Sequence, residues 1–488
     1  MLPYKSLIQI NRKSGVAVYI QLCNSFIDLI TNGTHQPADS LPSTRIISKL
    51  LGLNRNTAKM AYDELVSQGW AESIPRKGIF VQSKLPVLSK KKILDLESAA
   101  DVPGISFAWN NPFEGIIVRQ NIRNQLLAID EGFPDVRLTP VDLLMREYRS
   151  ISKKLIGKSF LRYGYPQGSD RLRAALCRYL SETRGLKVKP ENILITKGSQ
   201  MGIYLSAQLL ITKYDTIAVG DLNYRHADET FKFAGARLLR IAVDAYGMNV
   251  DLLEEELKRK SIKAVYVIPH HHFPTTVTLS MERRLKLLRL AKVYRFAIIE
   301  DDYDFDFHYN HKPFVPLAGI DHGHNVIYIG SISKTFAPAL RLGYLIAEPE
   351  FVGAACSLRQ MIDKQGDSLL EEAFSLLYEN GEMERHFRKS LKIYIERRDL
   401  FCSILQSNFK ERISFKIPEG GLAVWSEFDS NIDVRQLSKT AGNKGLKIAD
   451  GTFYHNESFK PNGLRLGFAS LNKTEIIQAL DLLQLALH

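Results

Sequence analysis

The sequence has few cysteines: four occur among its 488 residues, at Cys23, Cys177, Cys356 and Cys402. They lie far apart and form no Cys-x-x-Cys pair, so the sequence predicts neither a disulfide framework nor a zinc ribbon. It also lacks an apolar run near the roughly 18 residues that cross a bilayer, and residues 1–20 lack the apolar region of a signal peptide. We therefore expect a protein of the reducing cytoplasm with no membrane partner.

Extremes of composition are absent as well. Hydrophobic residues make up 45% of the chain and charged residues 24%. This is the composition of a soluble globular protein, which excludes a mainly disordered or fibrous chain. Because 488 residues exceed what one hydrophobic core usually serves, we expect two or three folded units.

Basic residues outnumber acidic ones, and the excess is unevenly distributed along the chain. The sequence has 65 Lys and Arg against 53 Asp and Glu, a net charge of +12. Residues 1–90 hold eleven basic and five acidic residues, so this short head carries +6 of the net charge. The excess is compatible with an anionic partner, although a solvated charged surface explains it equally well at this point.

The basic head contains three predicted helices followed by two short strands. Apolar side chains recur every three or four residues, Ser43 and Asn54 can cap helices, and Pro75–Gly78 is a turn sequence. The helices are expected over residues 19–30, 44–51 and 55–66, and the strands over residues 71–74 and 79–82. Three helices followed by a hairpin is the layout of a winged helix-turn-helix.

Cations of the head gather at the start of the third helix and at the tip of the hairpin. In winged helix-turn-helix folds that end of the helix enters the major groove, where side chains reach base edges and phosphates. A packing module without a DNA role explains the apolar periodicity, but it does not explain this clustering. The residues predicted to bind DNA are Ser43, Arg45, Arg55, Asn56, Thr57, Lys59, Lys77 and Gly78.

The stretch LPSTRIISKLLGLNRNTAKMAYDELVSQGWAESIPRKGIFV, residues 41–81, resembles the DNA-binding domain of GntR-type bacterial transcription regulators over its whole length. The resemblance implies a bacterial protein whose partner is a double-stranded DNA operator. We expect the winged helix-turn-helix domain over residues 1–83, a linker over residues 84–112 and a large second domain over residues 113–488.

The large domain shows an alternation of short apolar runs, rich in β-branched residues, with helical stretches such as residues 281–294. The runs span residues 193–195, 216–219, 264–268, 297–299 and 326–329. This α/β alternation predicts a mostly parallel sheet covered by helices on both faces. Ligands of such sheets bind outside the carboxyl ends of the strands.

Polar residues follow three of these strands. They are Lys197–Gln200, Glu300–Tyr303 and Gly330–Thr335, with Arg341 further on. Pyridoxal phosphate (PLP) requires a lysine amine for its Schiff base, a carboxylate for the pyridine nitrogen and an anion site such as a helix start. Lys334, Asp301 and the glycine turn at Gly198 supply these three features, so the pattern predicts a PLP site.

The region from about Phe113 onward resembles a fold-type I aminotransferase, and SISKTFAPALRLGY closely resembles the lysine signature of that family. The resemblance implies these roles: Lys334 forms the Schiff base, Asp301 faces the pyridine nitrogen, Tyr303 lies near the ring hydroxyl and Tyr224 stacks on the ring. It further implies that Ser331, Arg341, Gly198, Ser199 and Gln200 bind the phosphate, and that Tyr163, in YGYPQG, reaches the phosphate of the neighbouring subunit of a homodimer. Arg465, in LRLGFA, matches the arginine that takes an amino-acid carboxylate. A GntR-type head on such a body is the architecture of the MocR/GabR regulators.

Two segments depart from the aminotransferase pattern. Phe273 stands where many family members have an asparagine that donates to the ring hydroxyl, and Tyr224 follows Asp221-Leu222-Asn223 in place of Asn-Pro-Gly. The run His270–His272 has no evident carboxylate or cysteine partner nearby, so we expect it to line the cofactor pocket and to bind no metal.

Two functions remain open on the sequence. The first is a PLP-dependent transcriptional regulator that senses an amino compound or PLP itself. The second is a working aminotransferase whose head only tethers it.

Overall fold

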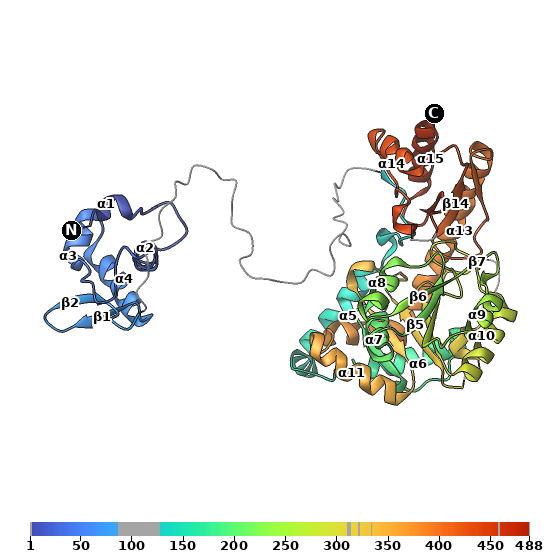
Figure 1. Ribbon diagram of the computed structural model, residues 1–488, viewed down its shortest axis with the longest axis horizontal. Coiled ribbons are helices and arrows are strands. Elements are labelled where there is room, and N and C mark those ends of the chain that lie inside the picture. Colours follow the sequence, from blue (N-terminus) through green and yellow to red (C-terminus); the bar gives the residue numbers. More distant parts are fainter. Residues whose placement is uncertain are drawn as a thin grey trace. The chain divides into compact units, whose positions relative to one another are not determined.

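A computed structural model describes residues 2–85, 127–309, 314–320, 323–332, 334–456 and 459–487. The chain falls into two compact units, Met1–Gln120 and Asn121–His488, and each is described by itself (Figure 1). Apart from Lys84 and Leu85, the predicted linker lies outside the described residues, as does the predicted start of the large domain at residue 113. Those domain boundaries stay predictions.

The first unit has the predicted order of helices and hairpin, preceded by a short helix that the sequence did not indicate. Its elements are α1 (Tyr4–Leu7), α2 (Val18–Thr31), α3 (Thr44–Leu51), α4 (Arg55–Ser67), β1 (Ala71–Ile74) and β2 (Gly78–Val81). Ser43 accepts a hydrogen bond from the backbone N–H of Ile46, and Asn54 accepts one from that of Asn56, so both predicted caps are confirmed. Phe26 and Tyr62 pack edge to face in the buried core of this unit.

Seven strands form the main sheet of the described part of the second unit, in the order β4-β12-β11-β10-β9-β5-β6. They are β4 (Ile193–Thr196), β5 (Thr216–Gly220), β6 (Arg237–Ile241), β9 (Ala264–Val267), β10 (Ala297–Asp302), β11 (Val326–Ser331) and β12 (Gly343–Ile346). Within the sheet β12 pairs antiparallel with β11 and β4, whereas the other paired strands are parallel. The predicted α/β sheet is confirmed, with β6 and the antiparallel β12 as strands that the sequence did not indicate.

Helices cover both faces of this sheet, as predicted. Alternate residues of the buried strands enter different cores: Leu194 packs with one set of helices, and its neighbours Ile193 and Ile195 pack with another. One face carries α7 (Ser199–Leu210), α8 (Arg225–Phe233) and α11 (Pro349–Asp363). The other carries α6 (Asp170–Arg184), α9 (Val250–Leu257), α10 (Met281–Tyr294) and α12 (Ser368–Glu379).

A smaller sheet lies towards the C-terminus, at the upper end of the second unit in Figure 1. Its antiparallel strands are β13 (Ile413–Phe415), β14 (Ala423–Phe428) and β16 (Gly463–Gly467). Helices α13 (Glu382–Asn408), α14 (Val434–Asn443) and α15 (Lys473–Leu487) pack on it. Beside it, β15 (Leu446–Lys447) pairs in parallel with β3 (Leu127–Ala128), which brings the first described residues of this unit next to its last strand.

The remaining elements are short or peripheral. They are α5 (Val141–Lys153), β7 (Val243–Asp244) and β8 (Gly247–Met248), and the 3-10 helices Val136–Leu138, Leu155–Leu161, Pro190–Asn192, Leu317–Gly319, Pro338–Leu340 and Thr452–Tyr454. Among the described residues, no helix is both long and apolar enough to cross a membrane.

Candidate functional site

The predicted cofactor residues lie mostly at the carboxyl edge of the main sheet. Two strands are longer than the sequence indicated: β10 extends to Asp302 and β11 to Ser331. Asp301 and Ser331 therefore belong to the ends of strands, as the penultimate residue of β10 and the last residue of β11, rather than to the loops that follow. Lys334 comes three positions after β11 and the Gly198 turn comes after β4.

Asp301 is a buried carboxylate with one satisfied oxygen. Its Oδ2 accepts a hydrogen bond of 2.7 Å from the hydroxyl of Tyr266, whereas Oδ1 is buried and has no hydrogen-bond partner within the described part of the chain. Burial raises the pKa of Asp301 to about 7. An unpaired oxygen of this kind suits a protonated ring nitrogen, which can donate to it and offset its desolvation.

Lys334 carries a nucleophilic amine. Its Nζ donates a hydrogen bond of 2.9 Å to the carbonyl oxygen of Gly132 and lies 4.0 Å from the centre of the Phe133 ring. Burial and the nearby Arg465 guanidinium lower the pKa of Lys334 to about 8. A substantial neutral fraction is then present near neutral pH, and the neutral amine is the form that attacks an aldehyde.

The turn after β4 forms a narrow cradle at the start of α7. Gly198 has a φ of +78°, and a Cβ added to it would lie 2.7 Å from Nη2 of Arg341. The same Nη2 donates to the carbonyl of Lys197 at 3.1 Å, which holds the guanidinium against the turn. Together with the first backbone N–H groups of α7, from Ser199 and Gln200, this cation gives the turn an arrangement that suits an anion.

Tyr303 and Arg465 lie together at a second part of this edge. The Tyr303 hydroxyl donates to the carbonyl of His271 at 2.9 Å and accepts from Nη2 of Arg465 at 3.2 Å. Arg465, buried in β16, also donates to the carbonyls of Glu131 at 2.9 Å and Pro274 at 3.1 Å. All three acceptors are neutral oxygens. Among the described residues, no carboxylate forms a hydrogen bond with this guanidinium, so a ligand carboxylate would be its counter-ion.

Phe273 connects the aromatic residues of the site. Its ring lies edge to face with Tyr224, with centroids 5.5 Å apart, and 5.2 Å from the Arg465 guanidinium. Burial, followed by the Asp301 carboxylate, raises the pKa of Tyr224 to about 12, so its hydroxyl stays protonated. Phe273 therefore replaces the hydrogen bond of an asparagine with ring contacts to both neighbours.

Tyr163 is not brought to the other site residues within one chain. Its side chain is 89% exposed, on the segment between the 3-10 helix Leu155–Leu161 and α6. Its neighbour Gly164 donates its backbone N–H to the side chain of Gln365.

The histidine run corrects one sequence expectation. We expected no carboxylate near residues 270–272, yet His271 Nδ1 lies 2.8 Å from Asp304 Oδ1 and His270 Nδ1 lies 3.5 Å from Asp302 Oδ1. The expectation was wrong because Asp302, at the end of β10, and Asp304, just after it, lie beside histidines that precede them by more than thirty positions. Among the described residues, no group of three or more His, Cys, Asp or Glu side chains is arranged to hold a metal ion.

Sequence reasoning missed two contributors to the site. Tyr266, in the apolar run of β9, was read only as a strand residue, although a tyrosine in a buried strand needs a partner for its hydroxyl. The stretch Asp130–Phe133 was not noticed at all. Its last two residues form a Gly-Phe-Pro turn signal with Pro134, but it has no periodic pattern, and its contacts with Lys334 and Arg465 are to residues some 200 or more positions away.

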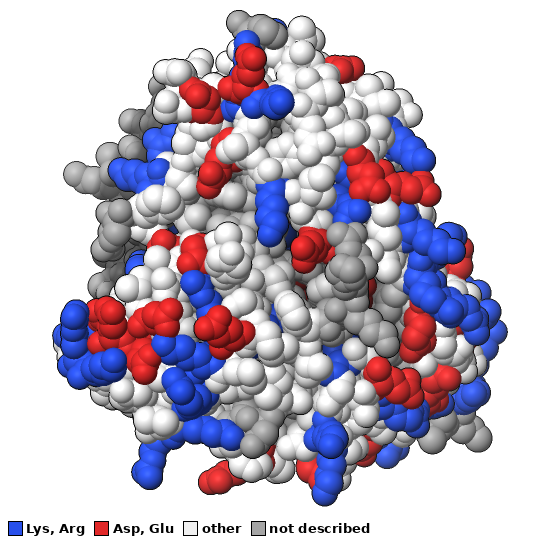
Figure 2. Space-filling view, turned by 90° about the vertical axis from the view of Figure 1, so that its right-hand side faces the viewer, with Lys and Arg blue, Asp and Glu red and all other residues white. Residues whose placement is uncertain are grey.

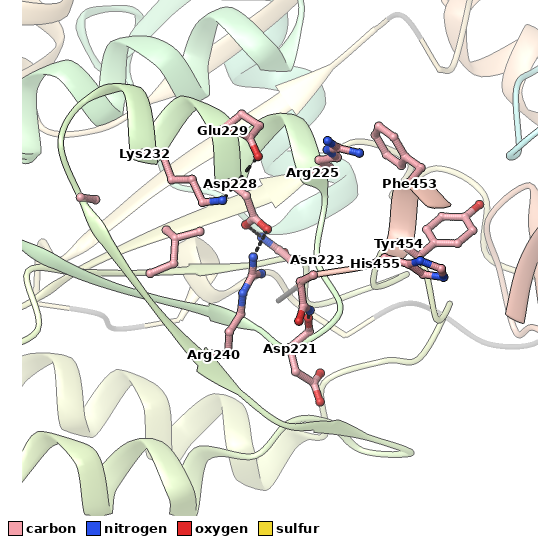
Figure 3. A pocket seen from close by; sticks show the side chains of 13 residues that line it. Asp221, Asn223, Arg225, Asp228, Glu229, Lys232, Arg240, Phe453, Tyr454 and His455 are labelled. Carbon is pink, nitrogen blue, oxygen red and sulfur yellow. Dashed lines mark hydrogen bonds and ion pairs between the residues drawn. The ribbon is translucent and has the colours of Figure 1, made fainter. Parts of the chain in front are cut away.

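A separate pocket of about 520 Å³ opens between α8 and the 3-10 helix Thr452–Tyr454 (Figure 3). Its charges largely pair with one another: Arg240 lies 2.6 Å from Asp228, and Lys232 lies 3.6 Å from Glu229. Because these partners satisfy each other, we assign no ligand to this pocket.

The predicted DNA-binding residues lie on the surface of the first unit. Arg45, Arg55, Asn56, Lys59 and Lys77 are exposed, and Thr57 is half-buried. Gly78, with a φ of +122°, closes the tight turn at the hairpin tip, and Ser43 serves as the cap of α3. On the face of the second unit in Figure 2, by contrast, basic and acidic side chains are interspersed.

Comparisons with known proteins agree with this architecture. The model of the aminotransferase class I and II family matches residues 136–483, and that of the bacterial regulatory proteins of the gntR family matches residues 19–81. The chain is 26% identical to the probable rhizopine catabolism regulatory protein MocR of Rhizobium meliloti, over 98% of this chain and 96% of that protein. It is 27% identical to the HTH-type transcriptional regulator TauR of Rhodobacter capsulatus, over 94% of each chain.

Two enzymes are similar to about three quarters of the chain. The aromatic-amino-acid aminotransferase 1 of Thermococcus litoralis is 30% identical over 72% of this chain and 86% of the enzyme. The kynurenine aminotransferase of Pyrococcus horikoshii has a TM-score of 0.69 at 27% identity and covers 74% of this chain and 90% of its own. The chain belongs to the class I and II aminotransferase family and, through its gntR-type head, to the MocR/GabR subfamily of DNA-binding transcription regulators.

Proposed function

We propose that this regulator binds PLP at the carboxyl edge of its main sheet and that an amino compound, or PLP itself, changes its occupancy of a DNA operator. One observation carries the proposal: the edge combines the Lys334 amine, the unpaired Asp301 oxygen and the Gly198–Arg341 cradle. PLP supplies an aldehyde for covalent attachment and an electron-accepting ring.

The residues at the edge divide this work among them. Lys334 attaches the aldehyde and Asp301 holds the protonated ring nitrogen. Tyr303 binds near the ring hydroxyl and Tyr224 packs against the ring. The phosphate is bound by Gly198, Ser199, Gln200, Ser331 and Arg341.

The effector is an amino compound with a carboxylate, because Arg465 suits that group. This guanidinium is buried, and its three hydrogen bonds go to neutral oxygens. A carboxylate offers two charged oxygens to the same fork and forms shorter, stronger hydrogen bonds than a carbonyl does. The ligand can change DNA occupancy only by binding two arrangements of the protein with different affinities.

The regulator acts as a homodimer in which Tyr163 completes the phosphate site of the partner. Large apolar side chains around it are exposed: Leu161 is 73% exposed, Tyr165 is 78% exposed and Tyr163 is 89% exposed. Such a run suits burial in an interface between two copies of the chain.

Absorbance and footprinting test the proposal together. Full-length protein is expected to turn yellow with PLP, and borohydride reduction is expected to leave the cofactor on Lys334. Lys334→Ala is expected to stay colourless. Protection of DNA upstream of the gene is expected to change when PLP and candidate amines are added. Covalent uptake of PLP by Lys334→Ala would disprove the lysine assignment, and unchanged protection with every ligand would disprove the sensor role.

An active aminotransferase is the second candidate, supported by the 30% identity to the aromatic-amino-acid enzyme. The two functions differ in turnover. Incubation with amino acids and a keto acid is expected to give at most slow product formation by a regulator. Sustained turnover at enzyme rates, without operator binding, would favour the second candidate.

A further inference from the structure

The stretch Asp130–Phe133 forms hydrogen bonds with two side chains of the proposed site, Lys334 and Arg465. The carbonyl of Gly132 accepts the hydrogen bond of Lys334 Nζ, and the carbonyl of Glu131 accepts that of Arg465 Nε at 2.9 Å. The Phe133 ring covers the Lys334 amine from another side, at 4.0 Å. Two adjacent peptide groups thus bind the amine of the cofactor site and the guanidinium of the effector site.

The stretch has further supports, among them the hydrogen bond from the Tyr454 hydroxyl to the Glu131 carboxylate. Asp130 accepts the backbone N–H groups of Gly132 and Phe133 through Oδ1, at 2.7 and 2.9 Å, which makes a compact turn. Its carbonyl accepts the N–H of Gly467 at 2.6 Å. On the N-terminal side, β3 is only two residues long. Loss of the two side-chain donors would leave the carbonyls of Glu131 and Gly132 without these hydrogen bonds and loosen the turn.

Ligand binding requires the same atoms. Condensation of the Lys334 amine with the PLP aldehyde would form a C=N bond, release the aldehyde oxygen as water and leave Nζ with at most one N–H, so the free amine that donates to Gly132 would be lost. A carboxylate held by Arg465 competes in the same way with the Glu131 carbonyl, and the charged acceptor forms the stronger hydrogen bond. The hydrogen bond of Gly132 thus competes with PLP for Lys334, and that of Glu131 competes with the effector carboxylate for Arg465.

We propose that residues Glu131 and Gly132 form a latch, which is closed by Lys334 and Arg465 and opened when PLP and the effector carboxylate take those side chains. The inference rests on the proposed function and names the regulation of its site. The latch follows residues 84–126 in the chain, the stretch that joins the head to this unit. Release of the latch would loosen the turn that follows β3, the strand by which the chain enters the described part of this unit, and DNA binding can sense a ligand-dependent change there.

Hydrogen exchange measured by mass spectrometry tests the latch on the full-length protein. The reporters are the amides of Gly132 and Phe133, and the amide of Ile129, bonded to Lys447 in the β3–β15 pair, is the internal reference. Loss of one hydrogen bond to a charged group is expected to raise reporter exchange roughly ten-fold. We expect this increase in Lys334→Ala without ligand, and in the wild type on addition of PLP. Lys473→Ala, at an exposed lysine of α15, is the matched control and is expected to behave as the wild type.

The outcomes separate the latch from the proposed function. If the wild type turns yellow with PLP and reporter exchange stays the same or slows, the latch is wrong and the cofactor assignment stands. If the wild type takes up no PLP, the proposed function fails. The Lys334→Ala variant then still tests the contact between Lys334 and Gly132, because unchanged exchange of the reporter amides in that variant would overturn the latch as well.

A second variant tests the connection to DNA without altering a ligand group. The Tyr454 hydroxyl donates to the Glu131 carboxylate, and Tyr454→Phe removes only this support of the latch. Operator affinity of the ligand-free variant is expected to shift by roughly two- to ten-fold in the direction that PLP and the effector produce in the wild type. Unchanged affinity, or a shift in the opposite direction, would overturn the regulatory role.

Discussion

The hydroxyl of Tyr266 donates a 2.7 Å hydrogen bond to Oδ2 of Asp301, and this bond leaves Oδ1 of the same carboxylate buried without a partner among the described residues. The two residues lie on the neighbouring parallel strands β9 and β10. Because Tyr266 satisfies only one side of the carboxylate, the second oxygen needs a donor from outside the chain, such as a protonated ring nitrogen.

Asp301→Asn is expected to stabilise the second unit at alkaline pH in the absence of PLP. Burial raises the pKa of Asp301 from 3.8 to about 7, so the wild type loses stability as the pH rises from about 4 to 7 and the unfolded chain releases its proton first. The full difference is at most about 4 kcal/mol. Asparagine has no such titration.

Urea unfolding at pH 5 and pH 8, followed by near-ultraviolet circular dichroism, measures this difference. The stability advantage of Asp301→Asn is expected to grow by about 2.7 kcal/mol between the two pH values. Glu300, whose pKa burial raises to about 8, is present in both proteins and its direct contribution cancels. An advantage that is equal at both pH values would contradict the prediction.

Local patterns explain how much of the site could be predicted from the sequence. A β-branched run followed by polar residues marks the carboxyl end of a strand, and for parallel strands those ends meet at one edge. Lys334, Asp301 and Gly198 could therefore be placed together although they are up to 136 positions apart. The helices of the head could also be predicted from the sequence, because Ser43 and Asn54 cap them through hydrogen bonds to residues only two or three positions away.

Features that depend on tertiary contacts could not be predicted. The antiparallel β12 is an apolar stretch whose direction is set by its neighbours β4 and β11. The pairing of His271 with Asp304 and that of Arg465 with Glu131 join segments that share no periodicity. In each case the partner is chosen by strand order, which a single run of residues does not encode.

Arg55→Ala and Lys77→Ala are expected to weaken operator binding while the PLP absorbance stays unchanged. Arg55 is exposed at the start of α4. If it reads a base, its replacement by alanine is expected to cost about 1–3 kcal/mol of binding free energy and to relax specificity at one base position. Replacement of Lys77, at the hairpin tip, is expected to weaken binding to all DNA sequences alike and to reduce the slope of log affinity against log salt concentration by about 1. Titration of operator variants at several salt concentrations checks both effects, with Lys473→Ala as control. Full binding by both variants would remove the winged-helix assignment.

Mixed dimers test whether Tyr163 acts on the partner. Tyr163→Ala and Lys334→Ala are each expected to hold PLP weakly or not at all. In a dimer of one chain of each kind, the intact Lys334 meets the intact Tyr163 of the other chain, so one complete site per dimer is restored. Co-expression with two affinity tags and PLP titration of the purified heterodimer measures this. No gain over the parent proteins, or a monomer in sedimentation, would show that Tyr163 does not act across an interface.

Gly198→Ala is expected to weaken binding of PLP through its phosphate. Gly198 and Gly185 both have a positive φ, +78° and +69°, which disfavours alanine at either position; the strain is larger at Gly198, because its ψ of 174° lies in a region that is essentially confined to glycine, whereas Gly185, with ψ 15°, is left-handed helical. The two differ in their surroundings: a Cβ at Gly198 meets Arg341 Nη2 at 2.7 Å, whereas a Cβ at Gly185 meets no atom within 4 Å.

Gly185→Ala is therefore a control for alanine at a positive φ that does not touch Arg341, and the pyridoxal titration below tests for the additional backbone strain at Gly198. We expect Gly198→Ala to displace the guanidinium and to bind PLP about ten-fold more weakly, while Gly185→Ala keeps the wild-type affinity. Titration with pyridoxal, which lacks the phosphate, separates the causes: its affinity is expected to be equal in the wild type and in both variants. If pyridoxal binding by Gly198→Ala falls as much as PLP binding, the substitution acts on the whole pocket and the turn is not the phosphate site.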